Sequence, residues 1–114
     1  MSDTVWVLRE GDVLAAAEIA GSVAARIRGL LGRSGLEGAL FLPHTKAVHS
    51  MGMRFPIDVA FLDGELNVLG VVRLPPWRMT RPRLRCRGVL EAEAGAFERW
   101  RLRPGDQLEL RRPS

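Results

Sequence analysis

The fold is decided by the stretch FPIDVAFLDGE, which covers residues 55–65. Ile57 to Leu62 predicts a strand buried on both sides, because apolar side chains occupy both faces of its alternation. Asp63-Gly64-Glu65 is typical of a hairpin turn, and residues 67–74 supply the returning strand. A carboxylate at the start of a buried strand needs a partner, so Asp58 also marks a polar site.

Outward from this hairpin, the chain continues as short apolar runs separated by glycine and proline turns. Two short helices are expected, one over residues 23–31 with Ser22 as its cap and one over residues 95–102. The order favours a mainly β (α+β) fold, a compact antiparallel β-barrel or sandwich-like domain spanning residues 1–114. Further strands are expected over residues 5–9, 13–19, 39–42, 47–51, 89–92 and 107–110.

Composition sets the class of protein. The chain has 114 residues and is 46% hydrophobic, which suits one globular domain with an ordinary core. No apolar run approaches the ~20 residues of a membrane span, and the first residues show no signal peptide. The single cysteine, Cys86, excludes an internal disulfide and fits a reducing compartment. We expect a cytoplasmic monomer or small homo-oligomer with no membrane partner.

The most polar motif is HSMGMRFPID, residues 49–58. The leading hypothesis is a binding module whose cleft takes a small anionic ligand. Arg54 would hold the anion, and Asp58 would fix Arg54 or accept from the ligand. His49 would line the same cleft, with Met51 and Met53 as its walls. In the structural alternative, Asp58 accepts backbone N–H bonds or pairs with Arg54 across a bend at Gly52 to Pro56.

Catalysis is the second hypothesis. A hydrolase-like enzyme could use His49 and Asp58 as an acid/base pair if the two side chains converge. His44 would complete a nominal two-histidine, one-carboxylate set, but no helix places the two imidazoles on one face. We therefore expect no metal and no cofactor. Cys86 lies among arginines without a nearby histidine or acid, so no catalytic role is expected for it.

The third hypothesis concerns an arginine-rich segment. Six arginines and no acid lie between Arg73 and Arg87, although the whole chain carries only +4. An extended backbone would place four alternating arginines on one side, and an exposed tryptophan precedes them, which suits weak nucleic-acid binding. Alternatively, the segment protects a sheet edge, and the excess of arginine over lysine reflects composition. The residues concerned are Trp77, Arg78, Arg81, Arg83, Arg85 and Arg87, and Glu91 and Glu93 could pair with them from a neighbouring strand.

Four segments in order resemble the small bacterial and archaeal proteins of the domain of unknown function 192 family. They are residues 25–33 (ARIRGLLGR), 49–58, 89–95 (VLEAEAG) and 103–106 (RPGD). The resemblance implies a mainly β domain with no established activity. Pro56 and Asp58 match the family pattern. His49 to Met53 stand where the family commonly has an aromatic-Met-Lys-Asn-Thr run, so no role of that asparagine carries over.

Overall fold

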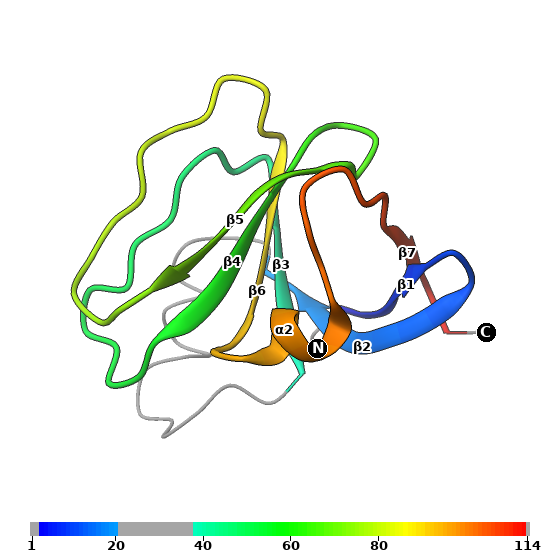
Figure 1. Ribbon diagram of the computed structural model, residues 1–114, viewed down its shortest axis with the longest axis horizontal. Helices are drawn as coiled ribbons and strands as arrows, with labels where there is room; N and C mark the ends of the chain where they lie inside the picture. The colour runs from blue at the N-terminus through cyan, green and yellow to red at the C-terminus, as the bar shows by residue number, and fades with distance from the viewer. Residues whose placement is uncertain (1–2, 21–37, 114) are drawn as a thin grey trace.

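The computed structural model describes residues 3–20 and 38–113 (Figure 1). The helix expected over residues 23–31, with its cap Ser22, lies outside the described residues. The described elements are the strands β1 (Asp3–Arg9), β2 (Asp12–Ile19), β3 (Ala39–Pro43), β4 (Ile57–Leu62), β5 (Val68–Leu74), β6 (Gly88–Glu93) and β7 (Glu109–Arg111), and the helix α2 (Ala96–Trp100). The mainly β prediction is confirmed, and β4 has the predicted bounds.

All seven strands belong to one sheet, in the order β5-β4-β6-β3-β2-β1-β7. Every pair in it is antiparallel except β2 and β3, which run parallel. A parallel pair needs a long crossover, and the connection between residues 20 and 38 is long enough to make one. The sheet curls but is not closed into a barrel. The short β7 pairs only with β1 in this sheet, and Asn67 and Gln107 join the two ends by an isolated bridge.

Two hairpins are formed, β1–β2 and the β4–β5 hairpin that the sequence predicts. Glu10 and Gly11 both have positive φ, 52° and 85°, which gives the β1–β2 turn the handedness that matches strand twist. Asp63 closes the β4–β5 turn by accepting the backbone N–H groups of Glu65 and Asn67, each at 2.9 Å. Donation from Asn67 lowers the pKa of Asp63 below its ordinary value.

Two apolar clusters lie on the two faces of the central strands. All six residues of β4 are buried, as the doubly apolar pattern predicts. Its even-numbered side chains Ala60 and Leu62 pack with β1, β2 and α2, and its odd-numbered ones, such as Val59, pack with the long loops. Asp58 therefore lies at the edge of the first cluster, directly beside α2.

The strand expected over residues 47–51 is not formed. His49 makes an isolated bridge with Met79, so the loop before β4 pairs with the loop after β5. Ser50 is fully buried where these two loops meet. The backbone N–H of Ser50 donates to the carbonyl of Arg78, and the Ser50 hydroxyl accepts from the Arg78 N–H. Residues 47–51 thus pair with a loop instead of the sheet. In the part of the chain that the structure describes, no helix is long and apolar enough to cross a bilayer.

Candidate functional site

Asp58 is a buried polar residue at the edge of the first cluster, with 4% of its surface exposed. Its Oδ1 accepts a hydrogen bond from Arg73 Nε at 3.2 Å. Its Oδ2 accepts the backbone N–H groups of Gly95, at 2.9 Å, and Phe97, at 3.1 Å. Asp58 therefore makes the kinds of contact that the structural alternative describes: it accepts backbone N–H groups and pairs with an arginine. That arginine is Arg73, whereas the sequence suggested Arg54.

The bonds to Gly95 and Phe97 explain why the chain turns into α2 at this point. Gly95 is the N-cap of α2 and has no side chain to accept the free N–H groups of the first turn. Asp58 supplies that acceptor from β4, and its negative charge suits the positive end of a helix. At the other end of α2, Arg9 donates to the carbonyls of Trp100, at 2.6 Å, and Arg101, at 3.2 Å.

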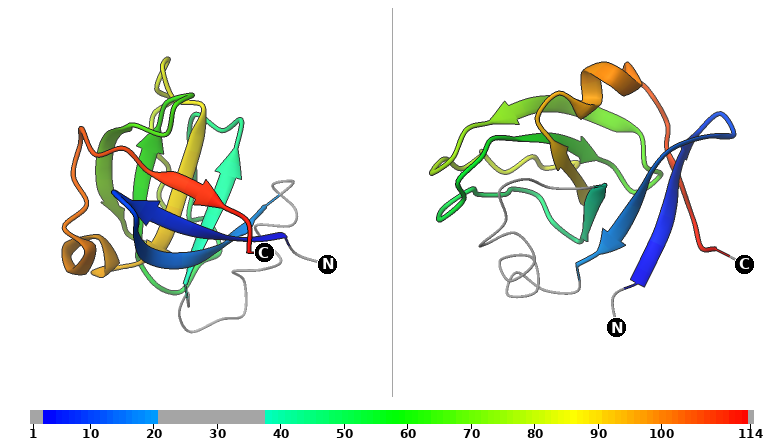
Figure 2. Two further views of the ribbon diagram at one scale, coloured as in Figure 1. Left: turned by 90° about the vertical axis from the view of Figure 1, so that its right-hand side faces the viewer. Right: turned by 90° about the horizontal axis from the view of Figure 1, so that it is seen from below.

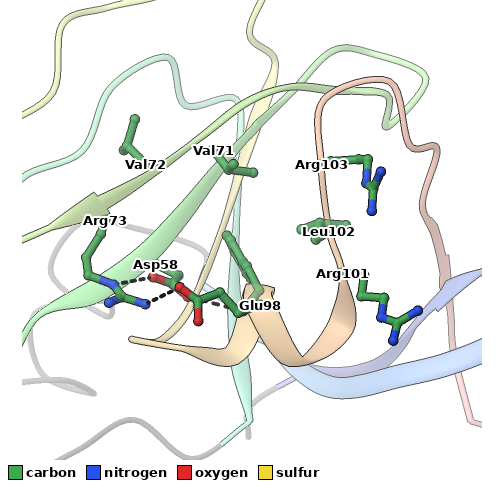
Figure 3. A pocket seen from close by; sticks show the side chains of 9 residues that line it. Asp58, Val71, Val72, Arg73, Glu98, Arg101, Leu102 and Arg103 are labelled. Carbon is green, nitrogen blue, oxygen red and sulfur yellow. Dashed lines mark hydrogen bonds and ion pairs between the residues drawn. The ribbon is translucent and has the colours of Figure 1, made fainter.

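A pocket of about 550 Å³ lies between β4, β5 and α2 (Figure 3). Its apolar wall consists of Val71, Phe97 and Leu102, since the Val72 side chain packs with the second cluster. Its charged residues are Asp58, Arg73 and Glu98 at one end and Arg101 and Arg103 at the other.

The two ends of this pocket differ in how their charges are compensated. Arg73 lies between Asp58 and Glu98, and its Nη2 is 3.7 Å from the exposed Glu98 carboxylate. Arg101 and Arg103 are both exposed, and neither forms an ion pair with a carboxylate of the described residues. The nearby Asp106 already binds the Arg9 side chain and the Arg103 backbone N–H. Positive charge is therefore available at the Arg101–Arg103 end.

The other four residues predicted to bind a ligand do not line this pocket. Met53 is buried in the second cluster, and Met51 and Arg54 are exposed. His49 is half-buried, and its Nδ1 accepts the backbone N–H of Met51 at 3.2 Å. Asp58 is thus separated from the other residues of the motif, because β4 carries it to the face that α2 covers.

The acid/base hypothesis needs contact between His49 and Asp58. Both oxygens of Asp58 are already bonded to groups other than His49. Among residues 3–20 and 38–113, no three His, Cys, Asp or Glu side chains lie close enough together to hold a metal ion. Cys86 is fully buried, and its Sγ lies 3.2 Å from the carbonyl oxygens of Thr45 and Gly88.

The arginine-rich segment does not present its side chains as one row. The Arg83 guanidinium lies over the Phe61 ring, 4.5 Å from its centroid, in the space that Gly70 leaves by lacking a side chain. Arg87 donates to the carbonyls of its own loop. Arg78, Arg81 and Arg85 are exposed. On β6, Glu91 is fully buried, and Glu93 pairs with Arg99 at 2.6 Å instead of this segment.

Four charged residues of the pocket were not predicted as site residues: Arg73, Glu98, Arg101 and Arg103. One of them could have been found, because the β4–β5 register pairs Asp58 directly with Arg73. Once the hairpin is drawn, the two side chains must share a face. Arg101 and Arg103 follow α2 without a comparable signal, and only the folded chain brings them to β5.

Comparison with known proteins gives a family but no activity. The family model DUF192, described as "Uncharacterized ACR", matches residues 5–110. The UPF0127 protein PH1112 of Pyrococcus horikoshii is 35% identical over 63 residues, which cover 55% of this chain and 55% of its own. The UPF0127 protein PF1050 of Pyrococcus furiosus is 35% identical over 66 residues, covering 58% and 57%. The match therefore spans about half the length of these curated relatives.

Two solved structures share the fold. A "putative transcription regulator" from Sinorhizobium meliloti 1021 superposes with a TM-score of 0.78 at 20% identity, over 96% of this chain and 94% of the other. A protein of unknown function from Novosphingobium aromaticivorans DSM 12444 superposes with a TM-score of 0.72 at 23% identity, over 95% and 84%. At these identities the likeness concerns the fold alone.

Proposed function

Since the chain belongs to the uncharacterised DUF192 family, we propose its function from the geometry of the pocket between β4, β5 and α2. The domain is a binding module, and its ligand is a small molecule with an anionic group and an apolar part. The observation that carries the proposal is the pairing of two arginines, Arg101 and Arg103, with an apolar wall in a pocket of about 550 Å³. Pockets of this size and lining are typical of small-molecule sites.

Each part of the pocket has a role in this proposal. Arg101 and Arg103 hold the anionic group, because a guanidinium offers paired donors to carboxylates, phosphates and sulfonates. Val71 and Leu102 contact the apolar part of the ligand. Asp58 does not touch the ligand; it fixes Arg73 and the start of α2, and so keeps the wall in place.

Binding is favoured over catalysis because the buried carboxylate is already engaged. A general base must reach the substrate proton, and Asp58 is only 4% exposed, with both oxygens already accepting hydrogen bonds from the protein. The proposed parts of His49, Met51, Met53 and Arg54 in ligand binding stay predictions, because they lie outside this pocket. The remaining proposals from the sequence are a cytoplasmic location and a monomeric or small homo-oligomeric state.

The experiment uses 8-anilinonaphthalene-1-sulfonate as the probe, because this dye joins a sulfonate to apolar rings. We expect the folded protein to bind it saturably at one site. Arg101 has a φ of 54°, so it is changed to Asn, which tolerates that conformation, together with Arg103→Gln. The double variant should weaken binding at least about tenfold, since each charged contact contributes more than about 1 kcal/mol.

Two control variants locate the site. Arg111→Gln removes an exposed arginine on β7, and Arg54→Ala removes the arginine of the predicted motif. Both should bind the dye as the unchanged protein does, with an unchanged circular dichroism spectrum. Equal binding by the Arg101→Asn, Arg103→Gln variant would refute the proposal, and loss of binding in Arg54→Ala would move the site to the motif of residues 49–58.

A further inference from the structure

Two loops that pack against each other, residues 44–56 and 75–87, form one end of the molecule, which we call the basic lobe. They carry seven basic residues and no acidic one. The rest of the chain then sums to −3, so the whole positive excess of the protein lies in this lobe. Figures 1 and 2 show the two loops together, on the side of the sheet away from β7.

Large apolar side chains are exposed on the same lobe. Met51, Trp77 and Met79 are exposed by 39%, 61% and 68%, and Leu84 is also exposed. The bridge between His49 and Met79 sets the register of the two loops, and the Trp77 N–H donates to the Ser50 carbonyl beside Met51. The three side chains therefore come from adjacent backbone segments.

The backbone that presents them is fixed by hydrogen bonds between the loops. The N–H of Thr80 donates to the carbonyl of Val48 at 2.9 Å, and that of Arg83 donates to the carbonyl of Lys46 at 3.2 Å. The backbone of Trp77 has a φ of 63°, a conformation that residues other than Gly and Asn rarely adopt. The structure thus holds a tryptophan out in water where burial would be more favourable.

We propose that the basic lobe docks on the surface of an anionic lipid bilayer. Trp77, Met79 and Met51 enter the headgroup region, where tryptophan is favoured because it is amphipathic. Arg54, Arg78 and Arg81, which are exposed on the same two loops, contact lipid phosphates. Basic residues near an anionic membrane each add attraction, and the absence of acids in both loops leaves this attraction unopposed.

The composition of the lobe favours lipid over nucleic acid. Sequence-tolerant nucleic-acid binding uses several aromatic platforms along a groove. Here Trp77 is the one exposed side chain of the Phe, Trp or Tyr type in the two loops, and the other large apolar side chains exposed there are methionines and a leucine, which offer no aromatic platform. Arg83 is also withdrawn onto Phe61. Aliphatic and thioether side chains beside a tryptophan suit shallow insertion into a bilayer surface.

The test is cosedimentation of the protein with vesicles of phosphatidylcholine alone or of phosphatidylcholine and phosphatidylglycerol in equal amounts. We expect binding to the anionic vesicles only, decreasing as salt is added. Arg78→Glu with Arg81→Glu should lower the partition coefficient at least about tenfold. Trp77→Ala with Met79→Ala should lower it at least about fivefold.

Matched controls separate the lobe from general effects of charge and of tryptophan. Arg111→Glu with Arg112→Glu makes the same change of net charge on the far side of the molecule, and Trp6→Ala removes an exposed tryptophan of β1. Both should bind vesicles normally. Failure to bind anionic vesicles, equal loss in the far-side variant, or unchanged binding of Trp77→Ala with Met79→Ala would each overturn the proposal. Binding of a 20-residue oligothymidylate in place of vesicles would assign the lobe to nucleic acid.

Discussion

Replacing Asp58 by alanine removes the acceptor for three donors at once. The bond to Phe97 is buried, so its N–H loses its partner without gaining water and costs about 1–3 kcal/mol. The bond to Gly95 is part-buried, so water replaces some of it. The Arg73 side chain is 49% exposed and can be solvated by water, so losing its ion pair with Asp58 lowers the free energy of unfolding only slightly. We expect Asp58→Ala to lower the free energy of unfolding by about 2–4 kcal/mol in total.

Urea unfolding followed by circular dichroism at neutral pH measures this loss. For a domain of this size the melting temperature should fall by roughly 4 °C per kcal/mol. Asp58→Asn keeps one oxygen for the backbone and should lose about half as much. Arg73→Ala should cost less than about 1 kcal/mol. The assignment of Asp58 as the cap of α2 fails if Asp58→Ala costs less than about 1 kcal/mol, or if Arg73→Ala costs as much.

Three further predictions concern other parts of the chain. Because the pKa of Asp63 is lowered, its contribution to stability is complete above its ordinary value of 3.8 and disappears as the pH falls through the lower folded pKa. The difference in urea midpoint between the unchanged protein and Asp63→Asn should therefore shrink from pH 6 to pH 3, and a constant difference would contradict this. A Cβ added at Gly88 would lie 2.9 Å from Cζ of Phe41, so Gly88→Ala should cost about 1–3 kcal/mol. Phe41→Leu should recover part of that cost, whereas purely additive losses would argue against the clash. Cys86 is fully buried and should react with 5,5′-dithiobis(2-nitrobenzoate) only after unfolding, and rapid labelling of the folded protein would show that the loops over it open.

Local patterns were sufficient for much of the fold. β4 and its hairpin could be predicted because burial on both faces and a turn with Asp63 are properties of neighbouring residues. The strand predicted over residues 47–51 was wrong for the same reason. The composition of this segment is typical of a strand, but its hydrogen bonds go to a loop about 30 residues further along the chain. The pairing of β7 with β1 likewise joins segments near the two ends of the chain, which a local pattern does not contain.

The pocket was harder to predict from the sequence because the β4–β5 hairpin and the chain in and after α2, which are far apart in the sequence, build it together. Asp58 comes from β4, Arg73 from β5, and Arg101 and Arg103 from the chain after α2. The motif of residues 49–58 contains one of these groups, Asp58. It could not show that Asp58 faces α2 while His49 and Arg54 remain with the loops, because that separation arises where the chain enters the sheet.

The bonds at the two ends of α2 also set an order of events in folding. A five-residue helix is too short to persist in water by itself. Its N-terminal acceptor, Asp58, lies 37 residues before Gly95, and its C-terminal donor, Arg9, lies 91 residues before Trp100. Both strands must therefore be in place before the helix is held, so α2 should form late. It should also be able to detach while the sheet stays folded, and the amide of Phe97 should then exchange with solvent faster than those of β4.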